Sequence, residues 1–456
     1  MLNRKIDFFI KKFYKSTNNA LLITGSRQVG KTFSIRTFGK TYKSFIEINF
    51  VENPEYVDIF SNVTNSKDIL FRISVITNIP LIKGETLIFF DEVQKCPNIV
   101  TAIKFLVEEG SYRYILSGSL LGVELNDLRS EPVGFLGIKE MYPIDFEEFL
   151  LNIGINENII VSLRDSFLKN KSVDDFVHKK IMELFRLYLI VGGMPAAVTT
   201  YLKNNDLQEV LLIQKNIIQL YKRDISQYDK DNKLYIEDIF NLIPSELNAK
   251  NKRFILKNLN NNAKFNMYQN SFLWLQRAGV AIPVFNVEEP KQPLLLSRSR
   301  NLFKLFQNDI GLLASQYADG IQLAIIKDES DINYGSIYEN VVAQELTAHG
   351  FDTYYYNSKK RGELDFVIEY KEKVLPIEVK SGKDYEIHRA LANILECKEY
   401  DLPQAIVFHN GNLKNNGKII YAPIYMVMFL EKEENTPSFY KVDISMLGSS
   451  KRADQF

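Results

Sequence analysis

The chain has 456 residues, of which 46% are hydrophobic and 25% are charged. Because one hydrophobic core rarely serves a chain of this length, we expect two to four folded domains, and the composition excludes a disordered protein. The 56 basic and 56 acidic side chains cancel. Net charge therefore gives no reason to expect DNA or an anionic membrane as a partner, and either would have to bind a local patch.

Cysteine content and the length of apolar runs bear on where the protein works. The chain has only two cysteines, Cys96 and Cys397, which excludes a disulfide framework and a thiolate zinc cluster. The first residues carry charges where a signal peptide needs an apolar run. The longest uncharged stretch considered, 187–198, is much shorter than the ~20 residues of a membrane helix, and it contains Gly192, Gly193 and Pro195. We expect a cytoplasmic protein with no membrane partner.

The first third of the chain has the pattern of an α/β domain. Short apolar runs are separated by amphipathic stretches, and they lie at 21–24, 45–50, 87–90 and 112–116. Such runs are typical of parallel strands that are buried on both faces and joined by helical crossovers. A parallel sheet is therefore predicted here.

A phosphate-binding loop follows the first of these strands. The segment Gly25-Ser-Arg-Gln-Val-Gly30-Lys31-Thr32 fits the pattern GxxxxGK[ST] between a strand and a helix. The glycines would let backbone N–H groups turn toward phosphate oxygens, and the helix N-terminus adds a partial positive charge. Lys31 would reach the β and γ phosphates of ATP, and the Thr32 hydroxyl would bind Mg²⁺.

Acidic and hydroxyl side chains follow two other predicted strands. Asp91 and Glu92 come directly after 87–90, at the end of the strand where open α/β sheets bind ligands. Asp91 would hold Mg²⁺ through water, and Glu92 would act as general base on the attacking water. Ser117 or Ser119 would sense the γ-phosphate, although a tight turn after the strand explains the same residues equally well.

These motifs together resemble AAA+ ATPases. The segment 141–149 resembles the stretch that leaves their core, and Gly-Gly-Met-Pro at 192–195 is similar to the GxP motif of archaeal-type and STAND ATPases. The resemblance implies that Pro195 packs near the adenine, although a turn that ends a helix would also place a proline there. Such relatives usually receive an arginine from a neighbouring subunit. No pattern identifies Arg129 or another residue for that role, so ring assembly and oligomeric state stay open.

The middle of the chain is predicted to be mainly helical. Amphipathic helices between about 147 and 227 indicate a helical lid. Further helices ending near 279 precede a strand at 280–287, an order that resembles a winged helix-turn-helix. We expect another helical segment around 303–316 and a helix at 337–348.

Two strands near the C-terminus, 363–370 and 374–380, are predicted to form a hairpin. A two-residue turn at 371–372 would place Asp365 opposite Glu378, with Lys380 on the same face. Two carboxylates and a lysine can hold Mg²⁺ and activate water against a phosphodiester. A three-residue turn would shift this register, and an ordinary charged hairpin face would also carry these residues.

The hairpin resembles the PD-(D/E)XK restriction-endonuclease-like fold. Residues 362–368 and 376–382 resemble its core strands, and Glu339 resembles the acid of its first helix. The resemblance implies a metal site of Glu339, Asp365 and Glu378, with Lys380 as a catalytic partner. Such a fold can also bind nucleic acid or protein without catalysis.

Over most of its length the chain resembles a prokaryotic family that joins an AAA+ ATPase to a C-terminal domain of unknown function. The predicted units are an AAA+ P-loop core at 1–150, a helical lid at 151–228, a winged-helix-like unit at 229–300 and a nuclease-like α/β domain at 301–456. The first hypothesis is a Mg²⁺-dependent ATPase that controls a nuclease-like domain, which binds or cleaves DNA. The alternative is a nucleotide switch that recruits a protein or DNA partner through a catalytically inert nuclease-like fold.

Overall fold

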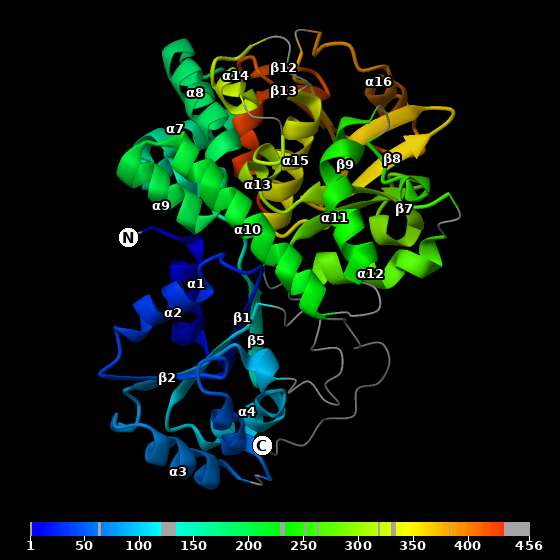
Figure 1. Ribbon diagram of the computed structural model, residues 1–456. Coiled ribbons are helices and arrows are strands. Elements are labelled where there is room, and N and C mark those ends of the chain that lie inside the picture. Colours follow the sequence, from blue (N-terminus) through cyan, green and yellow to red (C-terminus); the bar gives the residue numbers. More distant parts are fainter. Residues whose placement is uncertain are drawn as a thin grey trace, which may run out of the picture.

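The computed structural model describes residues 2–62, 65–119, 134–228, 233–249, 252–261, 264–317, 320–329, 334–382 and 384–432. Arg129, considered above for a role in trans, lies outside them. Figure 1 shows two lobes, one coloured blue to cyan and one coloured green to red. Two clusters of buried hydrophobic residues lie wholly within residues 6–141, whereas the largest cluster runs from Ile144 to Leu430.

The smaller lobe contains a five-stranded parallel sheet. Its strands are β1 (Ala20–Thr24), β2 (Ser44–Asn49), β3 (Thr86–Asp91), β4 (Arg113–Ser117) and β5 (Leu136–Glu140), in the order β2-β3-β4-β1-β5. All four neighbouring pairs are parallel. The predicted parallel sheet is thus confirmed, and β5 adds a strand at its edge.

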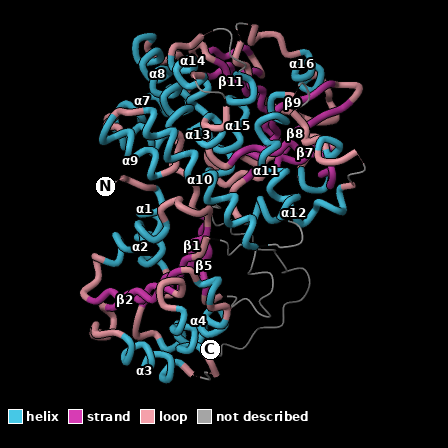
Figure 2. Tube along the Cα trace, in the orientation of Figure 1, coloured by secondary structure: helices cyan, strands magenta, loops and turns pink. Residues whose placement is uncertain are grey.

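Helices cover both faces of this sheet (Figure 2). They are α1 (Lys5–Ser16), α2 (Lys31–Gly39), α3 (Ser66–Ile76) and α4 (Asn98–Glu109). Alternate residues of β1 pack into different clusters: Leu21 and Ile23 pack with α1 and α2, and Leu22 packs with α3 and α4. Burial on both faces explains why these strands are apolar throughout.

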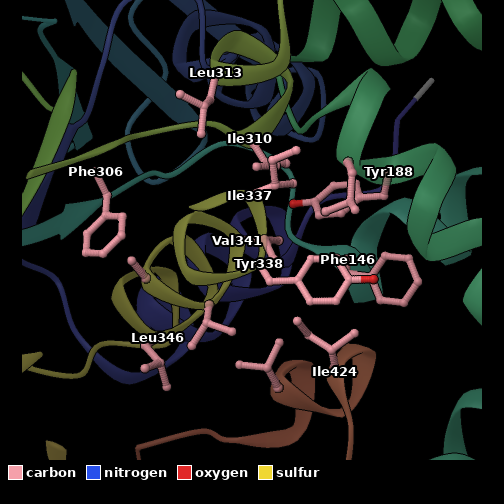
Figure 3. Packing of buried hydrophobic residues seen from close by; sticks show 14 of the residues in the cluster. Phe146, Tyr188, Phe306, Ile310, Leu313, Ile337, Tyr338, Val341, Leu346 and Ile424 are labelled. Carbon is pink, nitrogen blue, oxygen red and sulfur yellow. The ribbon is translucent and has the colours of Figure 1, made fainter. Parts of the chain in front are cut away.

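The larger lobe begins with helices and has further helices between its strands. They are α6 (Phe146–Asn152), α7 (Glu157–Leu168), α8 (Asp175–Val191), α9 (Pro195–Asn204), α10 (Leu207–Tyr228), α11 (Lys233–Asn248), α12 (Phe265–Arg277), α13 (Ile310–Ala314), α14 (Ile321–Ile326), α15 (Tyr334–Ala348) and α16 (Arg389–Leu395). The 3₁₀ helix η6 covers Ile424–Phe429. Figure 3 shows side chains of α8, α13, α15 and η6 meeting in one core.

A mixed eight-stranded sheet completes the larger lobe. Its strands are β6 (Ala281–Val287), β7 (Arg298–Gln307), β8 (Tyr354–Ser358), β9 (Gly362–Tyr370), β10 (Lys373–Val379), β11 (Ala405–His409), β12 (Lys414–Asn416) and β13 (Ile419–Pro423). Their order is β12-β13-β11-β10-β9-β8-β6-β7. The hairpin of β6 and β7 joins this sheet through parallel pairing of β6 with β8.

The expectation of a helix across 303–316 is wrong in its first part. Residues 303–307 belong to β7 and α13 begins only at Ile310. The end of β7 is buried on both faces, so it lacks the alternation of apolar and polar residues that signals a strand. The division of the chain at residues 150, 228 and 300 stays a prediction, and β7 runs across the last of these positions.

The helices of the larger and smaller lobes also bear on membrane insertion. None of the helices in the described ranges combines the length and the apolar character that crossing a lipid bilayer requires.

Candidate functional site

The P-loop joins β1 to α2, and its path depends on glycine. Gly25 has φ +131°, and a Cβ added there would lie 2.2 Å from the carbonyl oxygen of Met141. Gly30 has φ +104° and caps the N-terminus of α2. Larger residues would be strained or would clash at both positions. The two predicted glycines therefore fix a loop that opens toward the N-terminus of α2.

The Lys31 side chain lies inside this loop. Its Nζ donates hydrogen bonds to the carbonyl oxygens of Gly25 at 2.8 Å and Ser26 at 2.9 Å. Only 7% of the residue is exposed, and this burial lowers the pKa of Lys31 to about 8. A phosphate entering the loop would give this buried ammonium a negatively charged partner in place of neutral carbonyl oxygens, and this would favour its charged form.

The end of β3 brings Asp91 beside Thr32. The Thr32 hydroxyl donates to Oδ2 of Asp91 at 3.2 Å, and Nδ2 of Asn49 donates to the same oxygen at 3.3 Å. The Ser117 hydroxyl donates to Oδ1. Burial raises the pKa of Asp91 above its ordinary value, although the bond from Ser117 acts against this. Residues from three neighbouring strands thus meet at one carboxylate.

Glu92 follows in a left-handed conformation, with φ 56° and ψ 46°. This backbone region is costly for residues other than glycine and is often found at functional sites. Its carboxylate accepts hydrogen bonds from Gln94 and, at 3.3 Å, from the Ser119 hydroxyl. A cavity of about 320 Å³ adjoins it, lined by Arg27, Gln28, Gly30, Lys31, Thr32, Phe33, Arg36, Glu92 and Ser119.

These side chains fit a magnesium nucleotide. Thr32 and Asp91 offer hard oxygen atoms within hydrogen-bond distance of each other, which is the donor type that Mg²⁺ prefers. Lys31, at the N-terminus of α2, offers the positive charge for phosphates. The residues predicted for the P-loop and for the end of β3 therefore converge.

Pro195 also reaches the P-loop from far along the chain. It begins α9, and its Cγ lies 3.5 Å from the position of a Cβ added to Gly30. Met141 Cε lies at the same distance from that position. Pro195 is thus placed beside the nucleotide site, and its contact with adenine stays a prediction.

Three contacts tie the P-loop to the larger lobe, and the sequence did not predict them. Arg27 forms an ion pair with Asp224 of α10. Nδ2 of Asn308, just after β7, donates to the Ser26 hydroxyl at 3.4 Å. The Tyr221 hydroxyl donates to the carbonyl oxygen of Arg27 at 3.4 Å. No local pattern marks these partners because they lie about 200 residues or more from the loop.

The C-terminal hairpin has the predicted register. Lys371 and Glu372 have φ of 49° and 58°, as a two-residue type I′ turn requires. Ile377 pairs with Phe366, so the next positions, Glu378 and Asp365, lie opposite each other.

The predicted side chains of this hairpin interact with one another and with its backbone. Oδ2 of Asp365 accepts a hydrogen bond from the backbone N–H of Val379 at 2.8 Å. Nζ of Lys380 lies 2.8 Å from Glu378 Oε1. Although burial acts to lower it, the neighbouring Glu378 raises the pKa of Lys380 above its ordinary value. Lys380 is therefore a charged partner of Glu378.

A lysine that the sequence did not predict for this site lies among the carboxylates. Nζ of Lys304, on β7, lies 3.0 Å from Glu363, 3.3 Å from Glu339 and 3.8 Å from Asp365. Burial acts to lower the pKa of Lys304, but the three carboxylates raise it above its ordinary value. Among the described residues, no group of three or more His, Cys, Asp or Glu side chains is arranged to hold a metal ion.

The smaller lobe, with its parallel sheet and its P-loop facing an acidic strand end, is a P-loop ATPase domain. Residues 17–150 match a family model described as an AAA domain, so this lobe is of the AAA type. Residues 182–322 and 334–426 match two models described as domains of unknown function, DUF8612 and DUF4143. A search of curated proteins finds no match.

The chain is similar to several solved structures, of which three are described. The Walker-type ATPase of Pyrococcus abyssi matches at 14% identity over 69% of this chain and 96% of that chain, with a TM-score of 0.43. RuvB of Thermotoga maritima matches at 12% identity over 64% and 91%, with a TM-score of 0.28. ORC1 of Aeropyrum pernix, in complex with DNA, matches at 10% identity over 71% and 94%, with a TM-score of 0.26.

Proposed function

We propose that the protein is a Mg²⁺-dependent ATPase that uses its nucleotide state as a switch, and that the larger lobe responds to this state by binding a DNA or protein partner. The observation that carries the proposal is the direct bonding of the P-loop to the larger lobe. Ser26 and Arg27 lie within the loop and contact Asn308 and Asp224 outside the ATPase domain.

The proposed chemistry assigns one task to each residue. Lys31 neutralises the β and γ phosphates. Thr32 and Asp91 would hold Mg²⁺, which would supply further positive charge to the phosphates. Glu92 lines the cavity and accepts a proton from the attacking water as general base.

Arg27 is the residue through which the nucleotide state would first affect the larger lobe. Its side chain is 49% exposed, lines the cavity and pairs with Asp224. A γ-phosphate in the cavity would compete with Asp224 for this guanidinium, because a phosphate offers the same bidentate acceptors as a carboxylate and carries more negative charge. Loss of γ-phosphate returns Arg27 to Asp224, so the ion pair distinguishes ATP from ADP.

Hydrogen exchange tests the switch on the full chain. We expect amides of 303–312 to exchange at different rates with Mg²⁺-ADP and with a non-hydrolysable ATP analogue. Asp224→Asn removes the charge that competes for Arg27, so it should abolish the difference while nucleotide still binds. Asp206→Asn is the matched control, because Asp206 accepts its bonds from Gln208 and Glu209 through one oxygen, which asparagine retains. Identical exchange in both nucleotide states of the wild-type protein would refute the switch.

A second candidate function is a Mg²⁺-dependent nuclease. The specific observation in its favour is the register that places Asp365 opposite Glu378. The test is cleavage of DNA by the full chain with Mg²⁺ or Mn²⁺, compared with the Asp365→Ala, Glu378→Ala double variant. Cleavage by the wild type alone would support a nuclease, whereas equal cleavage by both proteins would assign it to a contaminant.

A further inference from the structure

The acidic cluster of the larger lobe surrounds a buried ammonium group. The Lys304 side chain is 1% exposed, and its Nζ contacts carboxylates of α15 and β9, namely Glu339, Glu363 and Asp365. Two of these, Glu339 and Asp365, belong to the metal site that the resemblance to restriction endonucleases implies. The lysine lies on β7, which is an edge strand of the eight-stranded sheet.

The charges of this region balance. Four carboxylates gather here, and each has a cationic partner among the described residues. The pairs are Lys252 with Glu339, Arg253 with Glu363, Lys304 with Glu339, Glu363 and Asp365, and Lys380 with Glu378. The region therefore has as many cationic as carboxylate groups and offers little net negative charge to an added cation.

A divalent ion would need oxygen atoms that are already engaged. Mg²⁺ demands near-octahedral coordination at about 2.0–2.1 Å. Both oxygens of Glu339 face lysines, and Asp365 uses one oxygen for the Val379 N–H and the other toward Lys304. Oε2 of Glu378 has no hydrogen-bond partner in the described part of the chain. Mg²⁺ usually binds through one or two carboxylates and completes its coordination with water, but every oxygen of these four carboxylates other than Glu378 Oε2 already faces a cation or a backbone N–H.

We propose that the Lys304 ammonium is the resident cation of this cluster, and that it replaces a divalent metal ion at the nuclease-like position. The cluster then acts as an ion-pair hub that joins α15, β7 and β9. This inference goes beyond the proposed ATPase switch and does not depend on it. It concerns the second candidate function, because a site filled by lysine has no metal ion to activate water.

Binding of Mn²⁺ to the full chain without nucleotide tests the inference, with free Mn²⁺ measured by its electron paramagnetic resonance signal. Four proteins are compared with the wild type: Lys304→Met, Lys252→Met, Asp365→Asn and the Lys304→Met, Asp365→Asn double variant. Lys252 also pairs with Glu339 but is 22% exposed, so its variant is the matched control. Any weak binding at the P-loop is common to all five proteins and cancels.

We expect the wild type, Lys252→Met and Asp365→Asn to bind Mn²⁺ equally. Lys304→Met should bind one additional ion per chain, and the double variant should lose it. Wild-type binding that Asp365→Asn abolishes would overturn the inference, as would a folded Lys304→Met protein that gains no ion. If Lys304→Met does not fold, the comparison of wild type with Asp365→Asn decides alone: equal binding supports the inference and a loss overturns it.

Discussion

At the scale of single residues, the nucleotide site gathers groups whose roles differ. Lys31 and Thr32 come from the P-loop, while Asp91 and Glu92 come from the end of β3. Asp91 is buried and bonded on both oxygens, whereas Glu92 lines the open cavity. This difference places Asp91 at the metal ion and Glu92 at the water in the proposed reaction.

Replacing Glu92 by glutamine should separate hydrolysis from binding. Glutamine keeps the size of the side chain but cannot accept the proton of the attacking water, so we expect kcat to fall by at least ~100-fold. ATP affinity should stay within about twofold, because Lys31 and Thr32 are unchanged. Phosphate release and nucleotide titration measure the two effects. Glu85→Gln, at an exposed partner of Lys43, should change neither, and full activity of Glu92→Gln would exclude Glu92 as the base.

The depressed pKa of Lys31 predicts how ATP affinity depends on pH. Because burial holds this pKa at about 8 in the free protein, the ammonium is charged below that pH and neutral above it. A bound phosphate favours the charged form, so the contribution of Lys31 to affinity should be constant below pH 8. Above pH 8 affinity should weaken by up to about tenfold per unit. Lys31→Arg should remove this dependence, since arginine stays charged. An unchanged profile in Lys31→Arg would assign the effect to another group.

Local patterns in the sequence predicted the P-loop residues, since GxxxxGK[ST] and the acidic strand end each lie within a few residues. Asn49 was missed, although it ends β2 directly beside Asp91 in the sheet. A search for polar residues at every strand end would have found it. Asp224 and Asn308 could not be found this way, because their positions depend on how two lobes pack.

At the scale of elements, the loop between α8 and α9 is where three segments meet. The backbone N–H of Gly193 donates to Asp309 Oδ2 at 2.6 Å, and its carbonyl oxygen accepts from Ile144 at 2.7 Å. Asp309 also caps α13 by accepting from Leu312. Glycine at this helix break lets the three backbones approach closely. The Gly-Gly-Met-Pro segment therefore has a structural role in addition to its contact with the P-loop.

Gly193→Ala should destabilise this junction. A Cβ there would lie 2.1 Å from the Ile144 carbonyl oxygen, and overpacking of this kind costs about 1–3 kcal/mol. Gly382→Ala is the control, because nothing lies within 4 Å of its added Cβ and its φ is not in the left-handed range. Unfolding in urea measures both free energies. Equal stabilities of the two variants would mean that the backbone at Gly193 moves aside freely.

Strand β7 shows why element type was harder to predict than the motifs. Residues 303–306 are buried on both faces, and they include the charged Lys304. The hydrophobic pattern alone cannot separate such a strand from a buried helix. The sequence did not indicate Lys304 as a site residue, because its carboxylate partners lie on elements that are distant in sequence.

At the scale of the whole molecule, α15 connects the acidic cluster to the exit of the ATPase domain. Glu339 lies at the cluster, and Asn340 exchanges hydrogen bonds with Gln307 of β7. Five residues after Asn340 on the same helix, Glu345 accepts a hydrogen bond from the backbone N–H of Phe146 at 2.9 Å. In the proposed switch, β7 and α15 are therefore the elements through which a change at the P-loop would reach the C-terminal sheet, and both are packed in one core (Figure 3).

The arrangement of lobes was the least accessible from the sequence. The ATPase core and the register of the C-terminal hairpin follow from local patterns. Local patterns do not predict that β6 and β7 share one sheet with the later strands, because β6 pairs with β8 across about 70 residues of chain. Long-range pairing of this kind is fixed by packing and leaves little local signature.

Isothermal titration of the full chain with ATP and Mg²⁺ tests the central claim most directly, namely that Lys31, Thr32 and Asp91 form a nucleotide site. We predict one ATP per chain for the wild type and for Lys43→Ala, which replaces an exposed lysine that pairs with Glu85 and does not line the cavity at the P-loop. Lys31→Ala should bind about 10- to 100-fold more weakly, as the loss of charge-assisted hydrogen bonds requires. No heat of binding in the folded wild type, or equal affinity in Lys31→Ala, would contradict the account.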